Sequence, residues 1–456
     1  MNTQENILGY EKLPRLLRSF AVPSIIAMLV SSLYNVVDQI FIGQGVGYLG
    51  NAATNVSYPL TTICLAIALL IGIGSASRYS LYLGADQKDR AASIVGNGIS
   101  MMMICGILYA ILIEIFQHPL LTAFGATEEI MPYALDYTRI TAVGMPFLII
   151  TNGISNLARA DGSPKYSMTC MLVGAIINTI LDPIFIFIFH MGVTGAAIAT
   201  VTGQFFSCLM ALRYIPKFQQ VKLKKSHFGV HISQWGANVT LGLSSSLNQL
   251  AITLVQVVLN NSLTYYGAMS AYGKDIPLAA CGIVMKTNSL LLAVIIGISQ
   301  GLQPIIGFNY GAKKYARVRK AYRLAIICDL LISAVGFCMF QFFPRQIISV
   351  FGSGDSAYMA FAVRFMRIFL FMILLNGVQM ISSNFFAAIG KPLKGMVLSL
   401  TRQVLFLIPL LLILPLFWGL DGILFAGPVA DFSAFVVTTL LIMKEMKHMR
   451  KMPSQA

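Results

Sequence analysis

The sequence contains few charged residues and no long polar segment that could form a water-soluble domain. Asp, Glu, Lys and Arg make up 11% of the 456 residues, whereas hydrophobic residues make up 57%. Soluble domains are about one quarter charged, so this composition indicates a membrane protein with several spans. Because no GxxxxGK[ST] loop and no candidate nucleophile–base pair occur, we expect neither an ATPase nor an intramembrane enzyme.

Paired cysteines are absent as well. The seven cysteines lie singly inside apolar runs, without CxxC pairs or neighbouring histidines, so we predict small core residues and no disulfide or metal site. One GxGxxG pattern occurs at residues 45–50. It follows an apolar helix and not a strand, so we do not expect a dinucleotide site there.

Twelve apolar segments are long enough to cross a membrane, which takes about 20 helical residues. They lie at residues 16–42, 53–76, 92–116, 131–155, 164–189, 193–214, 237–264, 279–302, 321–343, 357–384, 395–417 and 422–443. The polar segment before the first span does not resemble a cleavable signal, so we expect that span to be retained. The pattern predicts an all-α membrane protein with twelve transmembrane helices.

The basic residues gather on one side of these spans. If consecutive spans alternate in direction, 25 of the 32 Lys and Arg fall on the side of the two termini, and the opposite loops hold only Lys274 and Arg345. Cytoplasmic loops carry such an excess. We therefore predict a multi-pass protein of the cell (inner) membrane with both termini cytoplasmic. The formal net charge of +15 then needs no nucleic-acid partner to explain it.

The two halves of the sequence repeat one another. SNLARADGSP at residues 155–164 matches SNFFAAIGKP at residues 383–392, an offset of 228, and GVTGAAIA at residues 192–199 matches GLDGILFA at residues 419–426, an offset of 227. Several matches at nearly one offset indicate duplication of a six-helix unit. Because six is even, both copies enter the membrane in the same direction, which predicts a pseudo-two-fold axis along the membrane normal.

The repeat also predicts the domain organisation. We place an N-terminal six-helix lobe at residues 1–220 and a C-terminal six-helix lobe at residues 221–456, with their joint in the basic segment at about residues 213–236. Two similar bundles around a central cleft suit alternating access.

Two carboxylates lie inside apolar spans of the first half. Asp38 lies about five residues, or ~7 Å, before the outer end of its span, and Asp182 about eight residues, or ~12 Å, before the outer end of the fifth. An ionised Asp at the centre of a membrane helix costs ~2.5 to 3.5 kcal/mol on insertion scales, so its retention calls for a partner or a function. Because both spans run outward, the two side chains could share one site. The alternative is that Asp38 reaches the interface and Asp182 hydrogen-bonds a neighbouring helix.

Oxygen-bearing groups accompany Asp182 on its helix. Asn178 lies four residues earlier and therefore on the same face, and Pro183 leaves the carbonyl of Thr179 without its usual helical donor. Such a patch suits a proton, Na⁺ or a cationic group. Pro23 predicts a bend in the first helix, which could let that helix change shape when Asp38 is neutralised.

Several other charges lie within the spans, and their roles stay open at this stage. Asp136 and Arg139 have the i, i+3 spacing of a pair. The remaining residues could line a cleft or form buried ion pairs; they are Lys286, Asp329, Arg367, Arg402 and Asp431.

Taken together, these motifs resemble the MATE (multidrug and toxic compound extrusion) family, in its branch of bacterial drug exporters. The resemblance covers essentially the whole chain. It rests on VDQIFIGQGVG in the first span, NTILDPIFIF in the fifth, GVTGAAIAT in the sixth, the repeated SNxxxAxGxP and GISQGLQPIIGFNYGA after the eighth.

The resemblance implies two six-helix lobes forming a V-shaped cleft, and export of small cationic, amphipathic substrates in exchange for H⁺ or Na⁺. It implies a transporter and not an enzyme, with no cofactor beyond the transported ion, acting as a monomer in membrane lipid. It also implies that Asp38, Asn178, Asp182 and Thr200 form the cation-coupling site, where Na⁺ would bind, and that Pro23 and Tyr34 belong to the bending first helix.

One departure from the family pattern concerns the second half. Some relatives carry acidic residues in the seventh and tenth spans, whereas this chain offers Asn248, Gln249, Gln256, Asn260, Asn376 and Gln379 there. A second ion site in the C-terminal lobe is therefore not expected. The rival interpretation within the same superfamily is a flippase for a lipid-linked precursor, which predicts a strongly cationic cleft; a receptor or intramembrane enzyme is the remote alternative.

Overall fold

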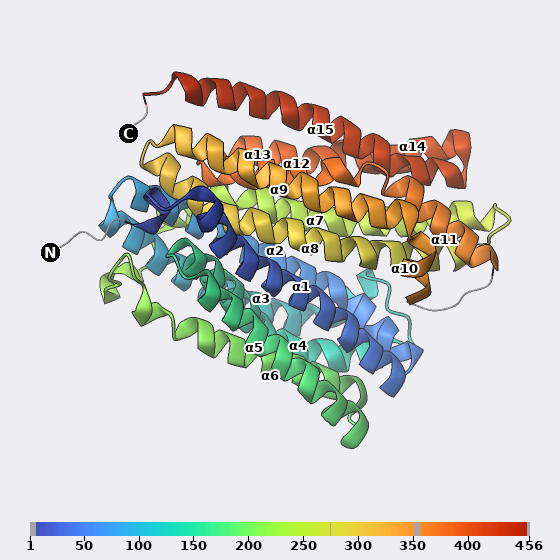
Figure 1. Cartoon of the computed structure of the whole chain (residues 1–456). Coiled ribbons are helices and arrows are strands. Elements are labelled where there is room, and N and C mark those ends of the chain that lie inside the picture. Colours follow the sequence, from blue (N-terminus) through green and yellow to red (C-terminus); the bar gives the residue numbers. More distant parts are fainter. Residues whose placement is uncertain (1–5, 274, 351–355, 454–456) are drawn as a thin grey trace.

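Long helices account for nearly the whole described chain, as the apolar segments predict (Figure 1). The computed structural model describes residues 6–273, 275–350 and 356–453, and these ranges contain no β-strand. The long helices are α1 (Leu13–Gly45), α2 (Tyr48–Gly84), α3 (Lys88–Ala123), α4 (Met131–Ala160), α5 (Pro164–Pro183), α6 (Gly192–Leu212), α7 (Ile232–Ala268), α8 (Asp275–Gly311), α9 (Tyr315–Phe342), α11 (Ser356–Phe369), α12 (Ile373–Ala388), α13 (Pro392–Leu400), α14 (Ile408–Trp418) and α15 (Leu420–Lys451). Shorter elements are the 3-10 turns η1 (Ile7–Gly9), η3 (Ile215–Lys217) and η4 (Lys225–His227), the helix α10 (Pro344–Val350), and the π-helical segments η2 (Ile184–Ile188) and η5 (Thr401–Leu407).

The predicted number of spans is confirmed. In the described residues eleven helical segments are long and apolar enough to cross a membrane, and the bent pair α11–α12 makes a twelfth. The tenth span is nevertheless not one helix, because α11 and α12 meet at an angle of 51°. Residues 370–372 at this break include no Pro or Gly, the usual causes of a kink, so nothing in the sequence indicates it. Lys274, one of the two predicted outer-loop cations, lies outside the described residues.

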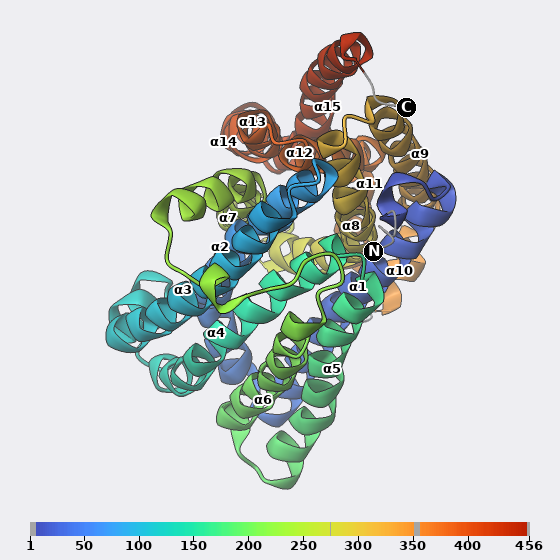
Figure 2. The ribbon, with the colours of Figure 1, turned by 90° about the vertical axis from the view of Figure 1, so that its left-hand side faces the viewer.

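All spans run roughly parallel, and the helices fan apart toward one side. The start of α1 and the end of α15 both lie on the left-hand side of Figure 1. We call this the terminal side of the molecule and the opposite side the far side. Seen from the terminal side in Figure 2, α3 to α6 form one group and α9 to α15 another, with α2, α7 and α8 between them. These groups belong to the two predicted lobes.

The duplication extends to the backbone conformation of the loops. Gly162 and Gly390, the glycines of the repeated SNxxxAxGxP motif, both adopt positive φ angles, of 94° and 77°. This region of conformational space is strained for residues with a Cβ atom, which explains a glycine at that place in both halves. Asp86 and Lys313, which are also related by the repeat, both have a φ of 57°.

The two lobes contact each other through glycines that mirror one another across the pseudo-two-fold axis. A Cβ atom on Gly84 of α2 would lie 2.0 Å from the carbonyl oxygen of Phe308, and one on Gly311 of α8 would lie 2.1 Å from that of Leu81. Gly311 and Phe308 are the repeat partners of Gly84 and Leu81. Only residues without a side chain allow α2 and α8 to approach this closely, and the contact lies on the terminal side.

The first helix of each lobe crosses over to the other lobe. The terminal half of α1 packs on α8, where a Cβ atom on Gly301 would lie 2.6 Å from the Cα atom of Ala21. Leu16 and Phe20 accordingly share a core with residues of α8, α9 and α12. The far half of α1 returns to the N-terminal lobe, where Ile42 packs with residues of η2 and α6. Pro23 lies inside this helix, next to the crossing.

A buried carboxylate holds the segment that joins the lobes. Asp161 accepts hydrogen bonds from the hydroxyl groups of Tyr79 (2.5 Å) and Tyr214 (2.7 Å) and from the backbone N–H groups of Gln219 (2.7 Å) and Gln220 (3.1 Å). Four donors satisfy a carboxylate that is otherwise inaccessible to water. They fix the start of the joint to the terminal end of α4.

Candidate cation site and central cavity

Asp38 and Asp182 face one another in the N-terminal lobe. Asp38 lies in the far half of α1, and Asp182 lies at the far end of α5, directly before Pro183 and the π-helical segment η2. Their carboxyl groups are close enough to interact electrostatically. Because two ionised carboxylates repel each other, the pair favours a state in which a proton or another cation is shared.

Asn178 connects this pair to its surroundings. Its side-chain amide donates to a carboxylate oxygen of Asp182 at 3.3 Å and to the hydroxyl oxygen of Thr200 on α6, also at 3.3 Å. The structure therefore brings together all four residues that the family resemblance implies: Asp38, Asn178, Asp182 and Thr200.

Three buried oxygen atoms of the cation site have no hydrogen-bond donor from the protein. One carboxylate oxygen each of Asp38 and Asp182 and the amide oxygen of Asn178 are buried without a hydrogen-bond partner. Buried acceptors without partners are costly, and a proton or a hard cation relieves that cost. A Na⁺ ion would be held here by these oxygens and the Thr200 hydroxyl. A third acidic ligand is not available, since the described residues contain no group of three His, Cys, Asp or Glu placed for a metal.

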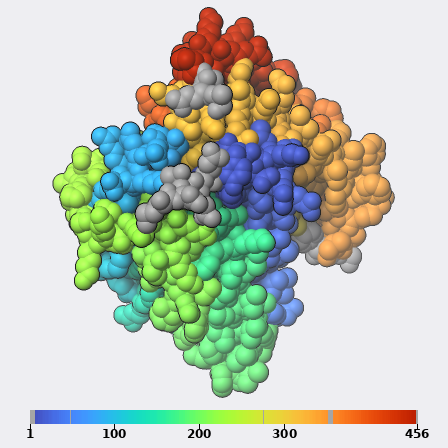
Figure 3. Space-filling view, turned by 60° about the vertical axis from the view of Figure 1, so that its left-hand side comes forward, coloured from blue at the N-terminus to red at the C-terminus, as the bar shows by residue number. Residues whose placement is uncertain are grey.

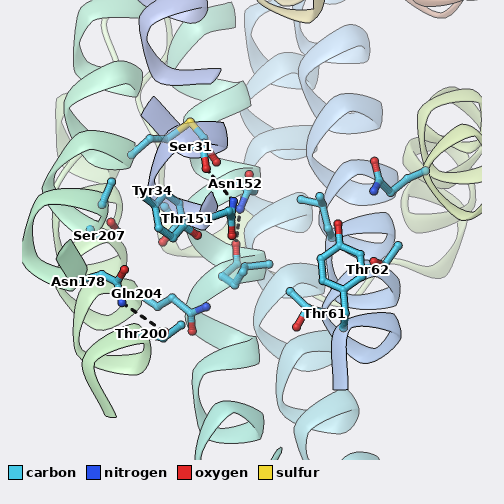
Figure 4. A pocket seen from close by; sticks show the side chains of 18 residues that line it. Ser31, Tyr34, Thr61, Thr62, Thr151, Asn152, Asn178, Thr200, Gln204 and Ser207 are labelled. Carbon is cyan, nitrogen blue, oxygen red and sulfur yellow. Dashed lines mark hydrogen bonds between the residues drawn. The ribbon is translucent and has the colours of Figure 1, made fainter. Parts of the chain in front are cut away.

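A cavity of about 190 Å³ lies beside the cation site (Figure 4). Asn178 and Thr200 are part of its wall, and a dashed line in Figure 4 marks their hydrogen bond. Tyr34 lines the same cavity, and its hydroxyl group is close enough to both carboxylates for an electrostatic interaction. Asn178 thus connects the cavity wall directly to Asp182.

The cavity wall carries no charge and combines polar groups with apolar ones such as Leu65, Leu148 and Met171. Hydroxyl, amide and aromatic groups from α1, α2, α4, α5 and α6 surround it, together with Gln249 from α7 of the other lobe. Asn152 and Gln204 also line this wall and are not among the residues predicted from the sequence. Each of the two is an amide in the middle of a span. Asn152 lies one helical turn before Asn156, and Gln204 lies one turn after Thr200, which is the signal that could have pointed to them.

A smaller cavity of about 90 Å³ continues into the C-terminal lobe. Gln249 lines both cavities, so they are neighbours across the central cleft. Asn248 and Gln379, two of the amides that stand where some relatives carry acids, line the smaller one. Tyr58 on the wall of the larger cavity is 56% exposed, so this part of the wall reaches the surface of the molecule.

At two positions that line the larger cavity in the N-terminal lobe, the C-terminal lobe has an ion pair instead. Gly174 and Gln204 line the cavity in the N-terminal lobe. Their repeat partners are Arg402 and Asp431, which bond to each other and whose side chains are 12% and 2% exposed. The pair places a guanidinium where the other lobe has a glycine, and it neutralises the Asp431 carboxylate.

The remaining charges fall outside the cation site. Asp136 and Arg139 are exposed and do not form the ion pair that their spacing allowed, among the salt bridges of the described chain. Lys286 is exposed on α8, and Arg367 donates to the backbone carbonyl of Gln341 at 3.0 Å. Asp329 is fully buried on α9, with Ser333 at 3.5 Å.

Arg159 differs from its predicted position. The charge pattern assigned it to a solvated loop, but it lies in α4 with only 4% of its surface exposed. Its guanidinium donates to the side-chain oxygens of Asn156 and Ser24 and, across the lobe boundary, to that of Gln300 in α8. The error arose because a positive-inside count treats every Arg near a span end as exposed.

Comparison with known proteins agrees with this architecture. The MatE family model matches residues 23–184 and residues 241–413, one stretch in each half of the chain. The chain belongs to the MatE family.

Curated relatives and solved structures cover almost the whole chain. Multidrug export protein MepA of Staphylococcus haemolyticus (strain JCSC1435) is 25% identical over 417 residues, which are 90% of this chain and 89% of that protein. The crystal structure of MATE in complex with MaL6 superimposes with a TM-score of 0.92 at 23% identity, and covers 99% of this chain and 100% of that one. An outward-facing conformation of a multidrug resistance MATE family transporter gives the same TM-score of 0.92 at 22% identity, again over 99% and 100% of the two chains. The MatE fold of two lobes is thereby confirmed.

Proposed function

We propose that this MatE protein is a secondary active antiporter that exports organic cations in exchange for H⁺ or Na⁺. The curated relatives that it resembles over nearly their whole length are named multidrug export proteins. The observation that carries the proposal is the position of Asp38 and Asp182 next to Asn178 and Tyr34, which line a cavity whose uncharged wall combines polar, aromatic and aliphatic side chains. Such walls accept varied amphipathic molecules, and the buried negative charge selects cations.

The conformation fits the releasing half of a transport cycle. The lobe-to-lobe hydrogen bonds of Arg159, Gln300 and Gln303 lie toward the terminal side, whereas Tyr58 at the cavity is exposed. With the terminal side cytoplasmic, as the basic loops favour, the cleft faces outward. In this state the coupling ion enters and the exported cation leaves.

Charge competition supplies the coupling. When the carboxylate pair holds no cation, its negative charge attracts a cationic substrate in the neighbouring cavity. A proton or Na⁺ at Asp38 and Asp182 removes that attraction, so the substrate dissociates outward. Coupling further requires that ion and substrate favour different conformations. α1 is suited to link the two, because Asp38 lies in its far half, Ala21 packs on the other lobe, and Pro23 lies between them.

The flippase alternative loses its main support. It requires a cationic cleft for a pyrophosphate head group, but neither central cavity is lined by Lys or Arg. Arg402 is neutralised by Asp431, and Lys286 and Arg367 lie outside both cavities.

Efflux of ethidium from proteoliposomes, driven by separately imposed pH and Na⁺ gradients, tests the proposal. We expect efflux under at least one gradient, and its loss in Asp182→Asn protein that reconstitutes and unfolds like the wild type. The proposal is wrong if the rate of ethidium efflux is independent of both gradients, or if a labelled lipid precursor is translocated without ethidium efflux.

A further inference from the structure

A basic groove lies outside the transport cavity, between two helices of the C-terminal lobe. It has a volume of about 390 Å³ and is lined by the beginning of α9 and the end of α15. The two helices share a buried core, to which Val318 and Ala321 of α9 and Met449 of α15 belong. Figure 3 shows this part of the surface, where gold α9 lies next to red α15. Nothing in the transport mechanism uses it.

Four cationic side chains line this groove and no acidic one does. Arg319, Lys320 and Arg323 come from α9, and Arg450 comes from α15. Among the described residues none of them lies within ion-pair distance of a carboxylate. The Nε atom of Arg319 is even buried without an acceptor.

The nearest acid of α15 is already neutralised by other groups. Glu445 is almost completely buried, and both of its oxygens bond to lysines of α13 and its preceding loop, Lys391 and Lys394. The four cations of the groove therefore keep their full positive charge. A ligand that binds them must bring acceptor oxygens and negative charge.

The deeper wall of the groove is apolar. Ile326 and Ile327 follow Arg323 by three and four residues, so they lie one helical turn farther into the membrane, and Ile327 is 47% exposed. Met446 faces them from α15. The hydroxyl group of Tyr322 bonds to Ser382 at 2.7 Å, which leaves its ring to line the groove.

We propose that this groove binds an anionic phospholipid of the leaflet on the terminal side, with the phosphate between Arg319, Arg323 and Arg450 and an acyl chain along Ile326 and Ile327. Cations at the membrane surface with apolar side chains directly beneath them match the order of groups in a phospholipid. A soluble phosphate would use only the upper half of the site. The proposal does not depend on what the protein transports.

Native mass spectrometry of the purified full-length protein tests this site. Phosphatidylglycerol is added in one series and phosphatidylcholine in another, and the lipid-bound fraction is measured. We expect phosphatidylglycerol to bind the wild type at least about tenfold more tightly, and this preference to disappear in the triple variant Arg319→Gln, Arg323→Gln, Arg450→Gln. The matched control removes three exposed charges of the same side from the joint: Lys222→Gln, Lys224→Gln, Lys225→Gln.

Two further measurements distinguish a lipid-binding site from a site that binds any small anion. Ile327→Gln should weaken phosphatidylglycerol binding, and an excess of inorganic phosphate should not displace the lipid. Equal binding of the two lipids, equal losses in the triple variant and its control, or full displacement by phosphate would overturn the proposal. All substituted side chains are exposed or half-buried, and lipid-free thermal unfolding verifies that the variants fold.

Discussion

Arg159 of the N-terminal lobe donates a hydrogen bond to Gln300 of the C-terminal lobe, and both side chains are buried. A buried guanidinium without a carboxylate partner depends on such neutral acceptors. The bond exists only while the lobes are closed on the terminal side. It therefore stabilises the conformation in which the cavity is accessible from the far side.

Removal of this bond should shift the conformational equilibrium. Loss of one acceptor to a buried charge costs about 1–3 kcal/mol, so Gln300→Ala should raise the population open on the terminal side roughly tenfold. Spin-label distances between the terminal ends of α6 and α15, in a background without the seven native cysteines, measure this population. Ser299→Ala is the matched control, because Ser299 accepts from Asn384 within its own lobe. Equal distance distributions in both variants would contradict this role.

Close packing of α2 and α7 gives a second prediction. A Cβ atom on Gly242 would lie 1.8 Å from the carbonyl oxygen of Leu70, whereas one on Gly236 of the same helix would meet nothing within 4 Å. Gly242→Ala should therefore hold the lobes apart on the terminal side, and Gly236→Ala should not. Faster amide hydrogen exchange in the adjoining turns of α2 and α7 is the expected signature. If Gly242→Ala exchanges like Gly236→Ala, the contact does not determine closure.

The ion pair of the C-terminal lobe gives a third prediction. Asp431→Asn leaves Arg402 buried without its counter-ion, which should cost about 3–5 kcal/mol and lower the thermal unfolding midpoint. Installing the residues of the N-terminal lobe at the same positions, Arg402→Gly with Asp431→Gln, should restore much of the loss.

An exposed ion pair is the control for this third prediction. The side chains of Arg364 and Asp421 form a 2.8 Å salt bridge and are 46% and 40% exposed. Asp421→Asn should therefore change stability by less than about 1 kcal/mol. A comparable drop for Asp421→Asn and Asp431→Asn would show that burial of the pair is unimportant.

The sequence predicts the spans and the duplication because both depend on local signals. Apolar length defines a membrane helix, and Gly162 and Gly390 mark a turn that requires a positive φ. The proximity of Asp38 and Asp182 was also accessible, because two outward-running spans carry their acids at similar depths.

Features that depend on packing between distant segments were not accessible. Arg159 could be counted as basic, but its acceptor Gln300 lies 141 residues away and on the other lobe. Likewise, the break between α11 and α12 has no local cause in the sequence. The Arg402–Asp431 pair becomes interpretable only when the repeat is combined with the cavity wall.

Antiport at Asp38 and Asp182 requires competition between the coupling ion and the substrate, and ethidium binding to the purified protein tests this competition most directly. Affinity is measured by fluorescence while pH is lowered in the absence of Na⁺, and while Na⁺ is added at alkaline pH. We predict that at least one of these changes weakens binding to the wild type at least about tenfold, and that neither affects a folded variant with Asp38→Asn and Asp182→Asn. The opposite result would be a wild-type affinity for ethidium that changes with neither pH nor Na⁺, or a double variant whose affinity changes with these ions as much as that of the wild type.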